Sequence, residues 1–181
     1  MSPRDLVITI SGPHGSGRST QARLIAAMFN LRYVSAGTLF REKAEELGVS
    51  LKEMSRMASA ESGFDNYLDR RSKEESRKGG VVLDATLSAW MAEEADLKIY
   101  LTCPLEERVR RIADREERSF EDVLEETKFR EENEADRFRE YYGIDLDDLS
   151  IYDVVLNTEY FEVHSTARIL KNVIEEYLSG K

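Results

Sequence analysis

The chain has 181 residues, of which 41% are hydrophobic and 34% are charged, and its formal net charge at pH 7 is −10. This length and composition predict one folded domain with its own hydrophobic core and exclude a disordered chain. The acidic balance argues against long nucleic acids and anionic membranes as partners, because both need a positive surface, yet it is compatible with a small anion held by a few arginines.

Side chains that form disulfides or bind zinc are scarce. Cys103 is the single cysteine, and the histidines are His14 and His164. We therefore expect no disulfide within the chain and no zinc site built from cysteine or histidine. We find no secretory signal and no apolar run of about 18 residues that could span a membrane. We expect a cytoplasmic protein, and we expect it to be a monomer.

Five short apolar runs alternate with helical patterns along the chain. The predicted strands cover residues 6–11, 32–35, 81–84, 97–102 and 153–157. The predicted helices cover residues 18–29, 37–47, 119–142 and about 162–178, with one more beginning after Pro104. Ser50 and Ser119 each begin a capping box. The alternation predicts an α/β fold, with a five-stranded parallel sheet flanked by helices, as a single domain over residues 1–181.

A glycine-rich segment joins the first predicted strand to the first predicted helix, with the sequence Gly12-Pro13-His14-Gly15-Ser16-Gly17-Arg18-Ser19-Thr20. It matches the phosphate-binding pattern G-x-x-x-x-G-K-[ST], except that Arg18 stands at the lysine position. Glycines let consecutive backbone N–H groups face one anion, and the start of the helix adds its positive end. We therefore expect these nine residues to bind ATP; the alternative is a turn that merely joins strand to helix.

Three positions in and near this loop carry more specific expectations. Arg18 would reach the β- and γ-phosphates, with a planar guanidinium in place of a compact ammonium, and Ser19 would supply a hydroxyl to Mg²⁺. His14 is expected to face solvent. Asp84 ends the third predicted strand, where a carboxylate would orient a magnesium-bound water, although a capping aspartate is the alternative.

The predicted helix 119–142 carries charged residues in the phase of its apolar stripe. Steps of three and four from the apolar positions lead to Arg130, Glu134 and Arg137, and on to Phe138 and Tyr141. Glu134 lies about one turn from each arginine, close enough to hold both. These charged side chains are therefore predicted to face inward.

A second arginine pair, Arg111 and Arg115, ends the preceding helix. We interpret residues 110–137 as a lid that closes over phosphates, with Arg111, Arg115, Arg130 and Arg137 stabilising the transferred group. The alternative is a surface helix crossed by salt bridges.

A further arginine follows the second predicted strand, in Ser35-Ala36-Gly37-Thr38-Leu39-Phe40-Arg41. Arg41 would face the crevice at the carboxyl ends of the strands, which indicates a second phosphate, on an acceptor. Asp65 and Asp69 lie on a later helical segment and could hydrogen-bond the base or sugar of that acceptor. The alternative for both is a solvated helix face.

Taken together, these segments resemble archaeal-type cytidylate kinases over residues 5–178. The segments are the phosphate loop, S-A-G-x-x-F-R at 35–41, R-E-x-x-E-x-x-R at 130–137, Tyr-Gly-Ile-Asp at 142–145 and Leu-Ser-Ile-Tyr-Asp at 149–153. The resemblance implies a nucleoside monophosphate kinase fold with a small acceptor-binding insertion at about 36–80 and a short lid. It also implies that Ser35 and Arg41 touch the acceptor nucleotide, and that Arg130, Glu134 and Arg137 contact the phosphates and the acceptor.

The chain departs from the family pattern at two places. Arg18 replaces the lysine of the phosphate loop, and Asp84-Ala85-Thr86 stands where the family has Glu-Gly-Arg. We expect transfer of the γ-phosphoryl group of ATP to CMP or dCMP with Mg²⁺ as cofactor, and small nucleotides rather than nucleic acids or membranes as partners. The alternatives are a kinase for another nucleoside monophosphate or small metabolite, and a nucleotide-binding regulator with weak catalysis.

Overall fold

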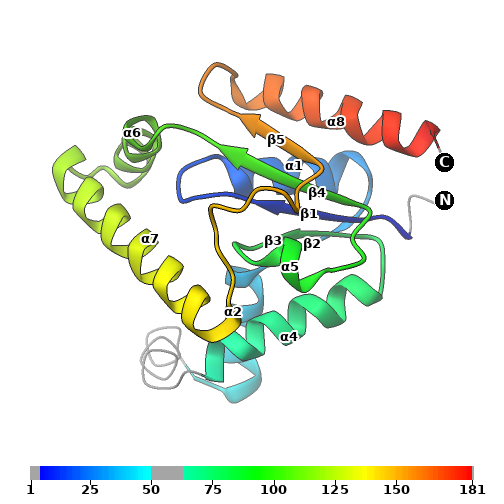
Figure 1. Ribbon diagram of the computed structural model, residues 1–181, viewed down its shortest axis with the longest axis horizontal. Coiled ribbons are helices and arrows are strands. Elements are labelled where there is room, and N and C mark those ends of the chain that lie inside the picture. The colour runs from blue at the N-terminus through cyan, green and yellow to red at the C-terminus, as the bar shows by residue number, and fades with distance from the viewer. Residues whose placement is uncertain (1–4, 50–62, 181) are drawn as a thin grey trace.

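The structure is a computed structural model that describes residues 5–49 and 63–180. Its described strands are β1 (Val7–Ser11), β2 (Arg32–Ser35), β3 (Val81–Asp84), β4 (Leu97–Thr102) and β5 (Val154–Asn157). They form one parallel sheet in the order β2-β3-β1-β4-β5, as Figure 1 shows. The predicted five-stranded parallel sheet is confirmed. The capping box predicted at Ser50 lies outside the described residues.

Seven described helices connect and cover these strands. They are α1 (Arg18–Met28), α2 (Ala36–Leu47), α4 (Gly63–Arg77), α5 (Ser88–Met91), α6 (Leu105–Glu116), α7 (Phe120–Tyr142) and α8 (Val163–Ser179). The short α5 was not predicted, because four residues are too few to show a helical period. Within the described part of the chain, no helix is long and apolar enough to cross a membrane.

The central strand β1 is buried along its whole length because helices cover both faces of the sheet. Ile8 and Ile10 belong to the larger core cluster, together with residues of α1 and α8. Val7 belongs to a second cluster on the opposite face, with Ala92 just after α5. Successive side chains of a strand point to opposite faces, so a strand buried on both sides needs a continuous apolar run.

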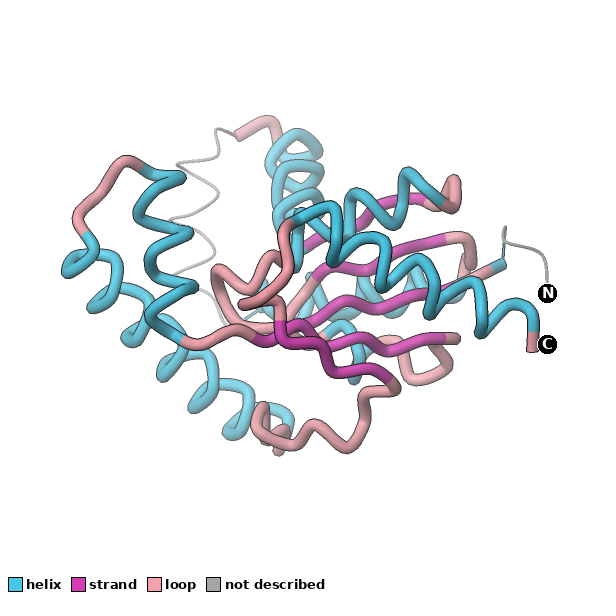
Figure 2. The backbone as a smooth tube through the Cα atoms, turned by 90° about the horizontal axis from the view of Figure 1, so that it is seen from above, coloured by secondary structure: helices cyan, strands magenta, loops and turns pink. Residues whose placement is uncertain are grey.

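The helix α7 leaves the sheet and lies beside the ends of the strands from which the phosphate loop emerges (Figures 1 and 2). Its first half packs on α6 through a separate apolar cluster that includes Val109, Ile112 and Val123. At its other end, the Tyr142 hydroxyl donates a hydrogen bond to Asp69 of α4. The helix therefore spans from α6 to α4 across the carboxyl ends of the strands, where parallel sheets bind ligands.

Candidate active site

The predicted phosphate loop connects β1 to α1 and lies close to β4 and α6. Gly12, Gly15 and Gly17 have positive φ angles of 147°, 80° and 89°. A Cβ atom at Gly12 would lie 2.2 Å from the carbonyl oxygen of Leu101, and one at Gly15 would lie 2.6 Å from that of Arg108. These positions require glycine, which leaves the loop in a conformation in which its amides can converge on an anion.

Arg18, the first residue of α1, reaches across to the end of β3. Its Nε donates to Asp84 Oδ1 at 2.6 Å, and its Nη1 donates to the carbonyl oxygen of Gly12 at 2.8 Å and to Thr86 Oγ1 at 3.2 Å. The two departures from the family pattern, Arg18 and Thr86, are therefore in contact with each other. In this conformation Arg18 neutralises a carboxylate beside the loop.

Asp84 is the group on which this contact depends, since it is only 2% exposed. The Tyr33 hydroxyl also donates to it, to Oδ2 at 2.7 Å. Burial, together with the charge of Asp84 and its hydrogen bond to the Tyr33 hydroxyl, raises the pKa of Tyr33, so the phenol stays a donor. Asp84 is thus held between a cation and a hydroxyl at the edge of the loop.

The candidate magnesium ligands are the Ser19 hydroxyl and the Asp84 carboxylate, at the start of α1 and the end of β3. Both are hard oxygen donors of the kind that Mg²⁺ prefers. Residues 5–49 and 63–180 contain no cluster of three or more acidic, histidine or cysteine side chains that could hold a metal ion alone. This donor set fits an ion that is bound mainly through phosphates and water, with little help from the protein.

A polar cavity, here called the loop cavity, opens beside the phosphate loop. Of the predicted arginines, Arg115 and Arg130 line it together with residues 17–20 of the loop and α1. Both are largely exposed, with side-chain exposures of 68% and 52%. Arg130 therefore keeps the predicted phase of α7 but faces an open cavity instead of packed side chains. The structure thus brings these two arginines, from α6 and α7, to one cavity beside the phosphate loop.

Arg111 lies in a neighbouring cavity, here called the side cavity, on the other side of Arg115. Its Nη1 and Nη2 donate to the hydroxyl and carbonyl oxygens of Thr158, both at 3.0 Å, and its Nε donates to Glu107. The side cavity is lined by loop residues, Gln21, Arg111, Arg115, Thr158, Phe161 and Val163. Arg111 therefore joins α6 to the segment after β5 next to the loop.

The second half of α7 follows the predicted inward phase only in part. Glu134 and Arg137 are half-buried and Phe138 is buried, but Tyr141 is 54% exposed, so the prediction is wrong for Tyr141. The Arg137 guanidinium lies 5.2 Å from the centroid of the Phe138 ring. Residues chosen at successive spacings of three and four spread around the helix over an arc wider than its buried face. The last residues of the extrapolated stripe are therefore exposed to solvent.

His14 does not face solvent, so that prediction is wrong. Its Nε2 lies 3.1 Å from Glu134 Oε1, with both side chains about one-fifth exposed. Burial acts to raise the pKa of Glu134, but the hydrogen bond and charge of His14, together with Arg130 and Arg18, outweigh it and lower that pKa. Glu134 is thus bonded to the phosphate loop through His14, a contact that was not predicted, and it also interacts electrostatically with Arg130.

On the acceptor side, the predicted residues have separate tasks. Ser35 caps α2: its hydroxyl accepts from the Thr38 N–H at 3.1 Å, while Thr38 Oγ1 accepts from the Ser35 N–H at 2.8 Å. Arg41 is exposed on the same helix. Asp69 holds the end of α7 through Tyr142. The side chain of Asp65 lies outside the described residues.

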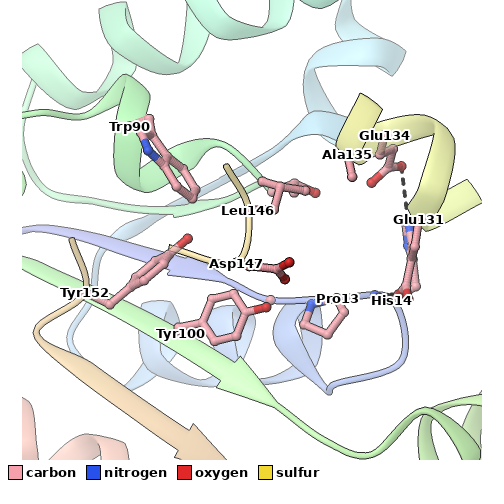
Figure 3. Close-up of a pocket in the computed structure, with 12 residues that line it drawn as sticks. Pro13, His14, Trp90, Tyr100, Glu131, Glu134, Ala135, Leu146, Asp147 and Tyr152 are labelled. Atoms are coloured by element: carbon pink, nitrogen blue, oxygen red, sulfur yellow. Dashed lines mark hydrogen bonds and ion pairs between the residues drawn. The ribbon is translucent and has the colours of Figure 1, made fainter. Parts of the chain in front are cut away.

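A third cavity, here called the aromatic cavity, was not predicted from the sequence. Figure 3 shows Trp90, Tyr100 and Tyr152 on one side of it, and His14 with Glu134 on the other. The Tyr152 ring packs edge-on against Trp90 at 5.7 Å and tilted against Tyr100 at 4.9 Å. In β4, Tyr100 stands between the buried residues Ile99 and Leu101. Because successive side chains of a strand point to opposite faces, this alternation could have indicated that Tyr100 lies on the face opposite to Ile99 and Leu101.

Comparison with known proteins identifies the family of the chain. The model of the cytidylate kinase-like family matches residues 7–160. The cytidylate kinase of Staphylothermus marinus is 49% identical over 96% of this chain and 98% of its own length. The cytidylate kinase of Ignicoccus hospitalis is 46% identical, over 93% and 98%. That of Methanocaldococcus jannaschii is 41% identical, over 94% and 98%.

Solved structures with the same fold include two shikimate kinases. The enzyme from Bacteroides thetaiotaomicron has a TM-score of 0.63 and 13% identity, over 94% of this chain and 98% of that chain. The enzyme from Acinetobacter baumannii, in complex with shikimate, has a TM-score of 0.64 and 17% identity, over 98% and 96%. At these identities the likeness extends to the fold alone.

Proposed function

Because the chain belongs to the cytidylate kinase-like family, we propose that it transfers the γ-phosphoryl group of ATP to CMP or dCMP. The observation that carries this proposal is the arrangement of the loop cavity and the aromatic cavity. Both are lined by Pro13 and His14, so the two cavities meet at the phosphate loop. A donor and an acceptor bound one in each would bring their phosphates together at that point.

The donor phosphates occupy the loop cavity in this account. The amides of the loop and the positive N-terminal end of α1 bind them, and Arg115 and Arg130 neutralise charge that develops during transfer. Arg111 was predicted to act on the transferred group, but its guanidinium is bonded to Thr158, so we assign it to the donor base instead. That base extends into the side cavity, between Arg111 and the apolar side chains of Phe161 and Val163. A guanidinium plane and an apolar surface suit a flat heterocycle.

The acceptor base occupies the aromatic cavity, whose Trp90, Tyr100 and Tyr152 rings offer stacking surfaces. Carboxylates at the rim of this cavity, including that of Asp147, accept hydrogen bonds. The exocyclic amino group of cytosine donates hydrogen bonds, whereas uracil presents a carbonyl oxygen at the same position. This charge pattern supports a cytosine acceptor over a uracil one.

The reaction needs no covalent intermediate with the protein. A phosphate oxygen of the acceptor attacks the γ-phosphorus in line, and the protein contributes positioning and charge neutralisation. Ser19 and Asp84 would hold Mg²⁺, which supplies charge neutralisation on the donor phosphates when bound. We assign the acceptor-binding insertion to residues 36–80 and the lid to residues 110–137, with Ser35, Arg41 and Asp65 on the acceptor side.

An acceptor panel tests the proposal. The protein is assayed with ATP and Mg²⁺ against CMP, dCMP, UMP and AMP, with one sample lacking any acceptor. We expect turnover with CMP or dCMP to exceed that with UMP or AMP. Faster turnover of another acceptor would replace the proposed substrate, and ATP hydrolysis that is independent of acceptor would favour a nucleotide-binding regulator.

A further inference from the structure

Arg108 of α6 is a buried cation that connects three parts of the site. Its side chain is 8% exposed. Its Nε donates to the carbonyl oxygen of Cys103 at 3.0 Å, and its Nη1 donates to the carbonyl oxygen of His14 at 2.8 Å. Its two Nη atoms also bind the carboxylate of Glu131 on α7, at 2.6 and 3.1 Å. One guanidinium thus joins the phosphate loop, the turn after β4, and α7.

Glu131 completes this contact from the other side. Besides binding Arg108, its Oε1 accepts a hydrogen bond from the backbone N–H of His14 at 3.1 Å. The peptide groups before and after His14 are therefore each fixed, one by Glu131 and the other by Arg108. The next residue, Gly15, packs so closely on Arg108 that a Cβ atom there would lie 2.9 Å from the Arg108 Cβ.

The geometry of this cluster bears on catalysis because loop peptides and lid arginines must face the same phosphates. A preorganised amide stabilises a phosphate only if its direction is fixed before the reaction. Arg130 precedes Glu131 in α7 and lines the loop cavity, so the pair between Arg108 and Glu131 also sets where Arg130 lies. A displacement of about 1 Å in such a group can lower a rate about 100-fold.

We propose that Arg108 is a positioning residue for phosphoryl transfer, which orients the peptides on both sides of His14 and holds α7 against the phosphate loop. The inference rests on the proposed function. A bidentate ion pair with a buried guanidinium is directional, and a lysine at this place keeps the charge without the paired geometry. Neutral replacement leaves the carboxylate of Glu131 without its cation.

The experiment compares Arg108→Met and Arg108→Lys with the matched control Arg168→Met. Arg168 lies on α8, away from the lid, with an exposed side chain that donates to Ser165 of its own helix. At a temperature where circular dichroism shows each variant folded, kcat and both KM values are measured with ATP and the preferred acceptor. We expect Arg108→Met to lower kcat about 10- to 100-fold, with both KM values changed less than about threefold.

The two other variants define the outcome further. Arg108→Lys should recover part of the lost kcat, and Arg168→Met should stay within about twofold of the unchanged protein. If Arg108→Met does not fold, Glu131→Gln replaces it, because this side chain is 27% exposed and its loss should lower kcat in the same way. A folded Arg108→Met or Glu131→Gln protein with unchanged kcat would overturn the proposal.

A second readout separates this inference from the proposed function. Trp90 is the single tryptophan of the chain and lines the same cavity as His14, Glu131 and Glu134. Without any substrate, Arg108→Met should shift the fluorescence emission of Trp90 because α7 moves from the loop, whereas Arg168→Met should not. Failure of the unchanged protein in the acceptor panel would refute the proposed function, while an unchanged Trp90 emission in Arg108→Met would refute the positioning role.

Discussion

Arg18 and Asp84 form an ion pair of 2.6 Å between the start of α1 and the end of β3, and the carboxylate in this pair is almost fully buried. The cation of the phosphate loop is therefore engaged with the protein itself, together with Thr86 and the carbonyl oxygen of Gly12. The sequence predicts that Arg18 also reaches the donor phosphates, so the same guanidinium would serve both Asp84 and the donor.

Substitutions of Arg18 test whether its positive charge or its guanidinium geometry is required next to Asp84. Arg18→Lys keeps the positive charge next to Asp84, and a compact ammonium suits the γ-phosphate, so kcat should be preserved or raised. Arg18→Met leaves a buried carboxylate without its cation and should lower the free energy of unfolding by about 3 kcal/mol. Steady-state kinetics and urea unfolding check both. Loss of all activity in Arg18→Lys would mean that the guanidinium itself is required.

Replacing Arg130 should lower kcat without lowering the stability of the fold. Its side chain is 52% exposed and lines the loop cavity, so Arg130→Ala removes charge from the phosphate site without opening the core. We expect kcat to fall about 100-fold or more, with little change in the melting temperature. Lys128→Ala, an exposed cation on the same helix, is the control. An equal fall in both variants would indicate a general effect of helix charge.

Replacing Trp90 should weaken the binding of the acceptor and leave the binding of the donor unchanged. Its ring lines the aromatic cavity, and stacking on a base contributes about 1–3 kcal/mol. Trp90→Ala should therefore raise KM for CMP about tenfold and leave KM for ATP within about twofold. Tyr160→Ala, at a ring that is 79% exposed, is the control. A rise in KM for ATP alone would place the acceptor base elsewhere.

The contact between Glu134 and His14 should appear in the pH dependence of stability. The pKa of Glu134 is lowered in the folded protein from its ordinary value of 4.5, so the unfolded chain binds a proton more tightly. The stabilisation is then complete above about pH 5 and is lost as the pH falls through the folded pKa. Glu134→Gln should reduce the difference in free energy of unfolding between pH 6 and pH 3. Glu132→Gln, an exposed neighbour, should retain the difference.

The parts of the site that were predictable from the sequence are those encoded by local pattern. The apolar run of β1 and the glycines after it predict a strand, a tight loop and a helix in that order, and the structure has all three. Ser119 caps α7 as predicted, because capping depends on residues three apart. Ser35 caps α2 as well, although the family resemblance implied only that it touches the acceptor.

The contacts that local pattern did not predict connect distant segments. His14 bonds to Glu131 and Glu134, which follow it by 117 and 120 positions. Arg108 looks like one more charged residue in a charged helix until the loop and α7 close around it. Helical phase gives the direction of a side chain but not what lies opposite, which is why His14 was misjudged and Arg108 was missed.

The most direct test of the proposed function follows the phosphoryl group itself. The protein is incubated with CMP, Mg²⁺ and ATP labelled at the γ-phosphate, and the products are separated. We expect the label to appear in the β-phosphate of CDP, at a rate that depends on CMP. Label that appears only as inorganic phosphate, at a rate independent of CMP, would contradict the proposed function.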